Sequence, residues 1–575
     1  MRNTIEIEDP NHRPFTISSN YAYYIGYLDL RPDGMGYHKR GEMNGLWYPP
    51  LRVLKNIYVS DGKTVFKPAH AEIGYSEARF EFYGTTLQIS FQDDNDFEIA
   101  VKNASNDVRK LIVELHPETV WYTVNDTRIK VNRRSAIIYS HMFPETRLRI
   151  AASSEFSIEN GRLSLLADGK SSLRISSACL HSHRPPIRVN RYRDIDRFSL
   201  LRGGGQIGEN FRTAKDNLIR LSLINQETGY GLTAGHPDFP WYFGIDTLLS
   251  FNGILDAGLF ELAFGSLNIL ARYSKSGKIP HEILTSGKVY NDGDLEETAL
   301  FPYAVFKYAE WAGYTEEMRH LATIASESFN YLFAHGFQGR GIMEDPKAGE
   351  GVDIDTISFT IMSLMELQKV MDMDQEAFGG IADAVKPTEA IDALRKTVQS
   401  FWMSERRTFA NRIVDGVPVD LGFWTSIIPF YTGIAGIDQY RKFVSDGGGL
   451  SRISSSSGIV VDASGNSMPV NTGMFVLGSI RYGDAENAAR YFKMLDRSLG
   501  LFSPGAYPEI SNNPQGCYLQ AWSAAIYIES IVEGFFGIHS EGGRLISKPF
   551  NSSLMPGGAT LKNVRFRNKY YDFIL

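Results

Sequence analysis

The sequence has few of the features that mark a membrane protein, a disulfide-bonded secreted protein or a nucleic-acid-binding protein. It has two cysteines, Cys179 and Cys517, which are far apart and support neither a disulfide framework nor a zinc site. No run of about 18 apolar residues could cross a bilayer. The net charge is −7, and basic residues do not cluster as phosphate-binding segments do. We therefore expect no zinc site and no membrane or nucleic-acid partner, and the sequence leaves open whether a structural calcium is bound.

The composition instead indicates a globular protein with large cores. Hydrophobic residues make up 43% of the chain and aromatic residues 12%, which excludes wholesale disorder. At 575 residues, more than one domain is expected. The first ten residues, MRNTIEIEDP, carry acidic groups where a secretory signal needs an apolar core, so we expect a cytoplasmic protein.

Residues 1–195 show the alternation of apolar and polar residues that is typical of β-strands. A period of two places one side of each strand in a core. Turn-rich segments such as DDND and NASND separate the runs. We expect an antiparallel β-sandwich here. The clearest alternating positions are Phe80, Phe82, Leu87, Ile89, Phe91, Phe97, Ile99 and Val101.

Residues 196–540 change to helical periodicity after the glycine run Gly203–Gly205. Apolar residues recur three and four positions apart, as in Leu300, Phe301 and Ala304. About twelve helices are predicted, enough for the six concentric hairpins of an (α/α)6 barrel. Residues 541–575 return to alternation and predict a small β tail packed on the body. The expected helix starts lie near residues 206, 243, 258, 295, 315, 353, 387, 421, 435, 470, 484 and 518.

Connections between every second pair of these helices are rich in glycine, proline, aromatic residues and carboxylates. Examples are GHPDFPWYFGIDT, SGKIPHEILTSGKVYNDGD and SPGAYPEISNNPQGC. In a toroid such connections would open on the same end. Loops on one face of a rigid scaffold commonly carry the functional site, so we expect the site there.

The most informative segment is Tyr507-Pro508-Glu509, followed by QGCYLQAWSAA at residues 515–525. It resembles the amylo-α-1,6-glucosidase part of glycogen debranching enzymes, in which a Pro-Glu loop precedes a Gln-Ala-Trp-Ser helix. The resemblance, which extends to glucoamylase-type enzymes, implies that Glu509 is the general base and that Gln520 and Trp522 bind substrate. A glutamate on such a loop can face a water molecule. The alternative is a surface carboxylate.

A second segment, FPWYFGIDT at residues 239–247, is similar to the Pro-Trp-Phe-x-Arg-Asp-Thr signature of the same enzymes, with Ile245 in place of the arginine. The resemblance implies that Asp246 holds hydroxyls of the terminal sugar and that Trp241 walls the pocket. A carboxylate can accept two hydroxyl hydrogen bonds, and an aromatic face covers the C–H face of a pyranose. Asp246 could equally cap a helix.

A third segment, GKIPHEI at residues 277–283, resembles the Gly-Leu-Ile-Pro segment of these enzymes and precedes YNDGD at 290–294. It adds His281 and Asp294 as candidate substrate-binding residues. The alternative interpretations are an ordinary loop histidine for His281 and the N-cap of the following helix for Asp294.

The general acid of the family lies in a loop that ends Trp-Met-Asp, ahead of a helix opening Val-Glu-Ile. Here Val352-Asp353-Ile354 fits the helix start, and the upstream loop lacks the tryptophan. Glu344 is the first candidate for the acid and Asp345 the second, which leaves Asp353 as a sugar ligand. Neighbouring carboxyls repel one another, which favours the proton that an acid must hold.

Together these segments predict an inverting glycoside hydrolase without a cofactor, acting on α-1,6- or α-1,4-linked glucose oligosaccharides or glucans. Inversion requires about 6.5 to 9.5 Å between acid and base, so that a water fits. One alternative is an inverting toroid enzyme that acts on trehalose, a mannoside or a compatible-solute glycoside. The others are a sugar phosphorylase and an inactive carbohydrate-binding relative.

Overall fold

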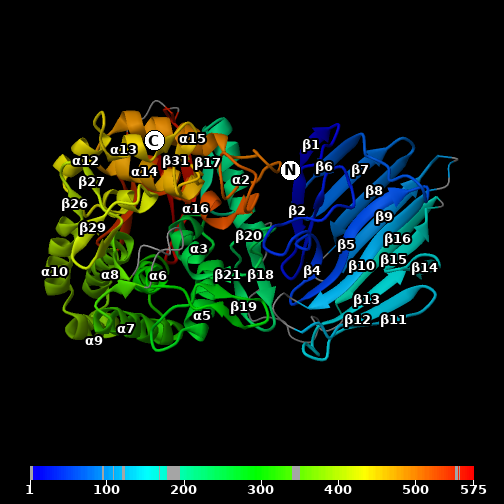
Figure 1. The fold of residues 1–575 in the computed structure, drawn as a ribbon, viewed down its shortest axis with the longest axis horizontal. Coiled ribbons are helices and arrows are strands. Elements are labelled where there is room, and N and C mark those ends of the chain that lie inside the picture. Colours follow the sequence, from blue (N-terminus) through cyan, green and yellow to red (C-terminus); the bar gives the residue numbers. More distant parts are fainter. Residues whose placement is uncertain are drawn as a thin grey trace.

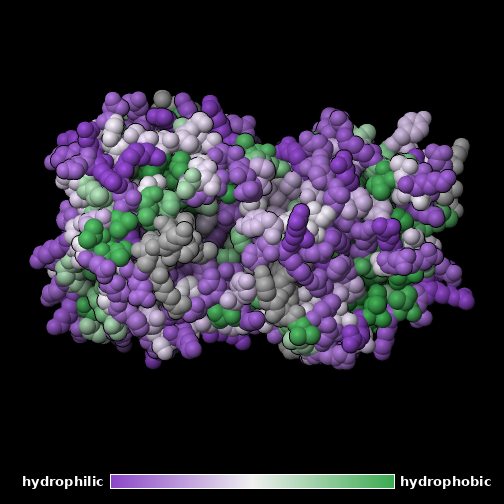
Figure 2. Space-filling view, in the orientation of Figure 1, coloured by the Kyte–Doolittle hydropathy of each residue, from purple (hydrophilic) through white to green (hydrophobic). Residues whose placement is uncertain are grey.

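The computed structural model describes residues 4–92, 96–105, 107, 109–119, 124–167, 169–177, 195–339, 350–550, 554–555 and 557–575. The chain forms an all-β body and a helical body that lie side by side (Figure 1). The face of the molecule shown in Figure 2 is mostly hydrophilic, with hydrophobic residues in separate patches. The large apolar content is therefore mainly placed in the cores.

Two antiparallel sheets form the β body in the described part of the chain. One has the order β1 (Ile5–Glu8), β6 (His70–Ile73), β7 (Glu77–Phe82), β8 (Thr85–Phe91), β9 (Asp96–Asn103), β16 (Lys170–Ser177), β13 (Arg147–Ala152), β12 (Ser135–Tyr139), β11 (Arg128–Val131). The other has the order β14 (Phe156–Glu159), β15 (Arg162–Leu166), β10 (Lys110–Thr119), β5 (Leu51–Ser60), β4 (Gly45–Tyr48), β3 (Tyr23–Tyr27), β2 (Pro14–Ser18). The core shared by the two sheets confirms the predicted sandwich.

The alternating residues of the sequence meet as cross-strand pairs in this core. Leu87 lies opposite Val101, and Ile89 lies opposite Ile99. All four side chains are buried. A shift of one residue would turn every one of these side chains to the other face, so the apolar pattern fixes the register.

The helical body is an (α/α)6 barrel. Its inner helices are α3 (Gly244–Leu249) with α4 (Phe251–Asp256), α6 (Glu296–Ala312), α8 (Ile354–Met373), α11 (Ile428–Tyr431) after η3 (Trp424–Ile427), α14 (Pro469–Arg481), and α16 (Ala521–Glu529) with η4 (Ser530–Phe535). From α4 to α16, each contacts the next, and α16 contacts α4, which closes the ring. The outer helices are α2 (Gln206–Leu221), α5 (Phe260–Tyr273), α7 (Arg319–Ala334) after η1 (Glu316–Met318), α10 (Pro387–Ser400), α12 (Ile437–Val444) and α15 (Ala485–Arg497).

Inner and outer helices differ in which faces they bury. Almost every residue of α14 and α16 is buried, whereas α15 buries one stripe, Ala488, Tyr491, Phe492 and Leu495. A helix surrounded by neighbours must be apolar on all sides, and one that faces water needs only an apolar stripe. One further helix, α9 (Gln375–Val385), lies between α8 and α10 and was not predicted from the sequence. Asp374 caps it, because its side chain accepts a hydrogen bond from the Ala377 N–H.

Connections that lead into the inner helices are long and carry short strands. They span residues 222–243, 274–295, 335–353, 401–423, 445–468 and 498–520. The return turns are short, as in residues 257–259 between α4 and α5. The connection strands are β18 (Ser222–Asn225), β19 (Gly229–Leu232), β20 (Gly235–His236), β21 (Tyr242–Phe243), β22 (Glu282–Ile283), β23 (Val289–Asn291), β24 (Gln338–Gly339), β25 (Gly351–Asp353), β26 (Trp402–Met403), β27 (Thr408–Phe409), β28 (Arg412–Val414), β29 (Val417–Val419), β30 (Ser454–Ser455), β31 (Gly458–Ile459) and β32 (Leu519–Gln520).

The C-terminal strands pack on the helical body. They are β33 (Ile538–Glu541), β34 (Arg544–Ser547), β35 (Thr560–Phe566) and β36 (Lys569–Ile574), and β35 also pairs with β17 (Leu200–Arg202) ahead of α2. Phe566 meets Trp311 of α6 edge-on at 5.9 Å between ring centroids. In the described part of the chain, no helix combines the length and the apolar character needed to cross a bilayer.

The two bodies share a buried interface. Tyr23, Trp47 and Tyr75 of the sandwich belong to the same hydrophobic cluster as the helices of the barrel. Arg220 of α2 donates from Nη1 to the Thr16 carbonyl at 3.1 Å. The sandwich is therefore fixed against the barrel and can contribute to a site at its rim.

Candidate active site

Glu509 lies on the connection between α15 and α16, where the backbone of Cys517 holds it twice. The Glu509 N–H donates to the Cys517 carbonyl at 2.8 Å, and the Cys517 N–H donates to Glu509 Oε2 at 2.8 Å. Gly516 has φ +78°, and a Cβ there would lie 2.4 Å from Glu509 Oε2. Only glycine suits this position, because a side chain would be strained and would displace the carboxylate.

The surroundings of Glu509 oppose its ionisation. Burial and, to a smaller extent, the Asp238 carboxylate raise its pKa, the Cys517 N–H lowers it, and the net result is a pKa of about 7. A carboxyl with a pKa near neutrality can exchange a proton with a water molecule at physiological pH.

A hydrogen bond between Asp246 and Gln520 joins two of the segments singled out in the sequence, residues 239–247 and residues 515–525. Gln520 Nε2 donates to Asp246 Oδ1 at 2.6 Å, and Gly235 of β20 pairs with Gln520 of β32. Burial raises the pKa of Asp246 to about 8; His281 opposes this shift, and Glu509 adds to it. Gln520 Oε1 and Trp522 Nε1 are buried and have no hydrogen-bond partner among the described residues.

Trp241 is fully buried and held by a residue that the sequence did not single out. Its Nε1 donates to Glu282 Oε2 at 3.0 Å, and its ring stacks on Phe243 at 6.1 Å. Glu282 begins β22 directly after His281, and β22 pairs with β21, which follows Trp241. Residues 239–247 and residues 277–283 are thereby joined by one small sheet.

His281 forms a buried ion pair with Glu297 at the start of α6, in which the ring Nδ1–H donates to Glu297 Oε1. Burial lowers the pKa of His281, but the charge and hydrogen bond of Glu297 outweigh this and raise it to about 9. The histidine is therefore a cation near Asp246 at neutral pH. Burial and the neighbouring Glu297 raise the pKa of Glu296 well above its ordinary value.

Asp294 and Asp353 approach each other at Gly339, the last described residue before residues 340–349. A Cβ on Gly339 would lie 2.9 Å from Asp294 Oδ2 and 3.0 Å from Asp353 Oδ2. Arg412 of β28 binds Asp353 with two parallel hydrogen bonds, 2.7 Å from Nε and 2.6 Å from Nη2. This arginine comes from a stretch in which the sequence suggested no functional residue.

Glu344 and Asp345, the candidates for the general acid, lie in residues 340–349, outside the described part of the chain. Apart from Trp522, whose indole Nε1 is buried, the other candidates of the sequence divide into two groups. Asp246, His281, Glu509 and Gln520 are linked through direct contacts or electrostatic effects on one another, and Trp241 joins them through Glu282, which it contacts and whose charge acts on Asp246. Asp294 and Asp353 meet at Gly339.

Two groups of side chains in the described residues have possible metal ligands within 4.8 Å of one another. They are Glu42, His116 and Glu118 in the sandwich, and His281, Glu296 and Glu297 in the barrel. In the first group, Arg52 binds both Glu42 and Glu118 at 2.7 Å. In the second, His281 binds Glu297. Both groups contain internal ion pairs, so no metal ion is needed to explain them.

Comparison with solved structures identifies the fold. Neither protein-family models nor curated proteins match the sequence. A bacterial glucoamylase complexed with acarbose matches with a TM-score of 0.60 and 12% identity, over 93% of this chain and 96% of that chain. A human-microbiome protein provisionally assigned as a kojibiose phosphorylase matches with a TM-score of 0.61 and 11% identity, over 99% of this chain and 95% of that chain. The chain shares the fold of these two proteins, a β-sandwich followed by a ring of six helical hairpins.

The six-hairpin fold confirms the predicted architecture, a sandwich followed by an (α/α)6 barrel. At these identities the likeness concerns fold alone, and the two similar proteins differ in the reactions that their names state. The reaction that this chain catalyses therefore depends on the residues of its own site and does not follow from the fold.

Proposed function

We propose that the protein is an inverting glycoside hydrolase that acts on α-linked glucose oligosaccharides or glucans, with Glu509 as the general base. The observation that carries the proposal is the placement of Glu509 on the α15–α16 connection. There the Cys517 backbone orients one carboxylate oxygen, and burial raises the pKa of the carboxyl to about 7. Such a group can take a proton from a water molecule without forming a covalent bond to the sugar.

The neighbouring groups have suitable chemistry for a sugar bound in front of Glu509. Asp246 and Gln520 offer carboxyl and amide oxygens for hydroxyls, and the Trp241 ring offers an apolar wall. Glu344 or Asp345 is the proposed acid that protonates the leaving oxygen, and Asp353 and Asp294 are proposed sugar ligands beside Gly339. Water would then attack from the Glu509 side, and the anomeric configuration would invert.

Hydrolysis is favoured over phosphorolysis by the charge around Glu509. Its pKa is shifted by burial, by the Cys517 N–H and by Asp238, and among the residues that the structure describes none of the groups that shift it is a cation. The negative charges of Glu509 and of the more distant Asp238 would repel inorganic phosphate at this position, whereas water carries no charge. We therefore expect turnover that does not depend on phosphate.

The test is the substitution Glu509→Gln, assayed on maltose, isomaltose, kojibiose, trehalose and an aryl α-mannoside. We expect the wild type to release glucose from at least one α-glucoside without phosphate. The variant should fold with an unchanged melting temperature but lose activity by about 10²- to 10⁴-fold, as removal of a general base does. Glu541→Gln, on an exposed hairpin, is the matched control and should stay active. Wild-type turnover by Glu509→Gln would contradict the proposal.

A further inference from the structure

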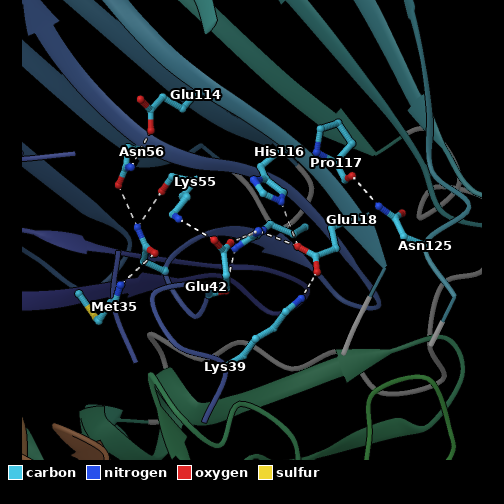
Figure 3. Close-up of polar contacts among 12 residues, drawn as sticks. Met35, Lys39, Glu42, Lys55, Asn56, Glu114, His116, Pro117, Glu118 and Asn125 are labelled. Atoms are coloured by element: carbon cyan, nitrogen blue, oxygen red, sulfur yellow. Dashed lines mark hydrogen bonds and ion pairs between the residues drawn. The ribbon is translucent and has the colours of Figure 1, made fainter. Parts of the chain in front are cut away.

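The β3–β4 connection of the sandwich, residues 28–44, is tied to the body of its own sheet by an ion-pair network (Figure 3). Arg52 of β5, which is fully buried, binds Glu42 and Glu118 at 2.7 Å each. Lys39 binds Glu118, and Lys55 binds Glu42 at 2.9 Å. Charges that are paired with more than one partner away from water hold a loop in one arrangement.

The tip of this connection is fixed to the barrel by Asp238. The N–H groups of Tyr37 and His38 donate to Asp238 Oδ1 at 2.8 Å and 3.0 Å. Asp238 is itself 2% exposed and lies three residues before Trp241. Gly36 has φ +93° and a Cβ there would lie 3.0 Å from Asp238 Oδ1, so glycine permits this close approach.

The two side chains at the tip join the aromatic residues of the candidate site. The His38 ring meets Trp241 edge-on at 5.3 Å and Phe239 at 5.5 Å. The Tyr37 ring meets Phe239 edge-on at 6.2 Å and is 57% exposed. Partial burial and the charge of Glu509 both raise the pKa of Tyr37.

We propose that Tyr37 and His38 form a sugar subsite that the sandwich supplies to the barrel. It would receive the second sugar unit of the substrate, the one released as the leaving group. An exposed aromatic ring at the rim can cover the C–H face of a pyranose, and the hydroxyl and imidazole groups can bind its hydroxyls. The subsite rests on the proposed function, because it assumes that the deeper sugar lies between Trp241 and Glu509.

This subsite makes the sandwich a determinant of specificity. Asp238 acts as a positioning residue, since it holds the backbone of the tip and reaches substrate only through Tyr37 and His38. The deeper position is lined by barrel residues, so a substrate with one sugar unit would use the barrel alone. A substrate with two units would use both bodies.

The experiment compares maltose and isomaltose with α-glucosyl fluoride, whose leaving group is not a sugar. For Tyr37→Ala we expect kcat/KM on the preferred disaccharide to fall about 10-fold, the loss typical of one aromatic contact. The loss on the fluoride should be at least about 5-fold smaller. Tyr37→Phe keeps the ring and should retain most disaccharide activity. Tyr83→Ala, a tyrosine 91% exposed elsewhere on the sandwich, is the matched control.

Different outcomes separate this inference from the proposed function. Equal losses on both substrates, or no loss on either, would overturn the subsite and leave the hydrolase proposal standing. If the wild type hydrolyses none of the substrates, the hydrolase proposal fails. Calorimetric titration with maltose then decides the subsite: weaker binding by Tyr37→Ala than by Tyr83→Ala supports it, and equal binding overturns it.

Discussion

The Glu509 carboxyl changes its charge within the physiological pH range, because its surroundings raise its pKa. Its pKa is raised to about 7, chiefly by burial, so the carboxyl is protonated below this pH and ionised above it. A general base works only when ionised. We therefore predict that kcat/KM rises with pH through an ionisation near 7 and is low at pH 5.

The contribution of Asp238 to this ionisation can be measured separately. Asp238→Asn removes a negative charge that raises the Glu509 pKa, but it keeps an oxygen that can accept from Tyr37 and His38. The rise of kcat/KM with pH should therefore occur at lower pH in Asp238→Asn than in the wild type. If the rise occurs at the same pH in both, Glu509 is not the group that titrates.

At the scale of elements, the pair Arg412–Asp353 joins β28 to β25 and to the start of α8. Both side chains are buried, and Arg412 is fully enclosed. Arg412→Met would leave Asp353 buried without the two hydrogen bonds it accepts from the guanidinium. The free energy of unfolding should fall by about 3 to 5 kcal/mol, the usual effect of removing one partner of a buried ion pair.

Urea unfolding of three variants tests this prediction. Arg412→Met with Asp353→Leu should recover part of the stability, because no buried charge is left unpaired. Arg441→Met breaks a surface pair with Asp438 whose side chains are 72% and 81% exposed, and it should change stability by less than about 1 kcal/mol. An Arg412→Met variant as stable as Arg441→Met would contradict the prediction.

The elements themselves were largely predictable from the sequence. Helices expected near residues 206, 295, 353 and 470 begin at Gln206, Glu296, Ile354 and Pro469. Apolar periodicity is a local signal, and it survives wherever a helix or strand packs on one core. Helix α9 was missed although it carries an Asp374 cap, because it lies in a stretch that matched no known motif.

Several residues of the candidate site could not be found in this way. Trp241 binds Glu282, which is 41 residues away in sequence, and Asp238 binds the Tyr37 backbone across 201 residues. Arg412 reaches Asp353 across 59 residues. No local pattern specifies such partners, since they are brought together only when the connections of the barrel and the sandwich have folded.

At the scale of the whole molecule, the sandwich and the barrel depend on each other. The shared cluster contains Tyr23, Trp47 and Tyr75 from the sandwich, all of them buried. Their burial would be lost if the bodies separated, and that loss would be unfavourable. The interface thus holds the β3–β4 connection against the barrel, where its tip contacts Asp238 and Trp241.

The inverting mechanism is tested most directly by the anomer of the first product. Proton NMR can follow the wild-type enzyme at high concentration on its preferred α-linked glucose disaccharide, before mutarotation equilibrates the glucose. If Glu509 directs a water molecule to the face opposite the leaving group, β-glucose appears first and α-glucose follows at the rate of mutarotation. Release of α-glucose first would contradict the assignment of Glu509 as the base of an inverting hydrolase.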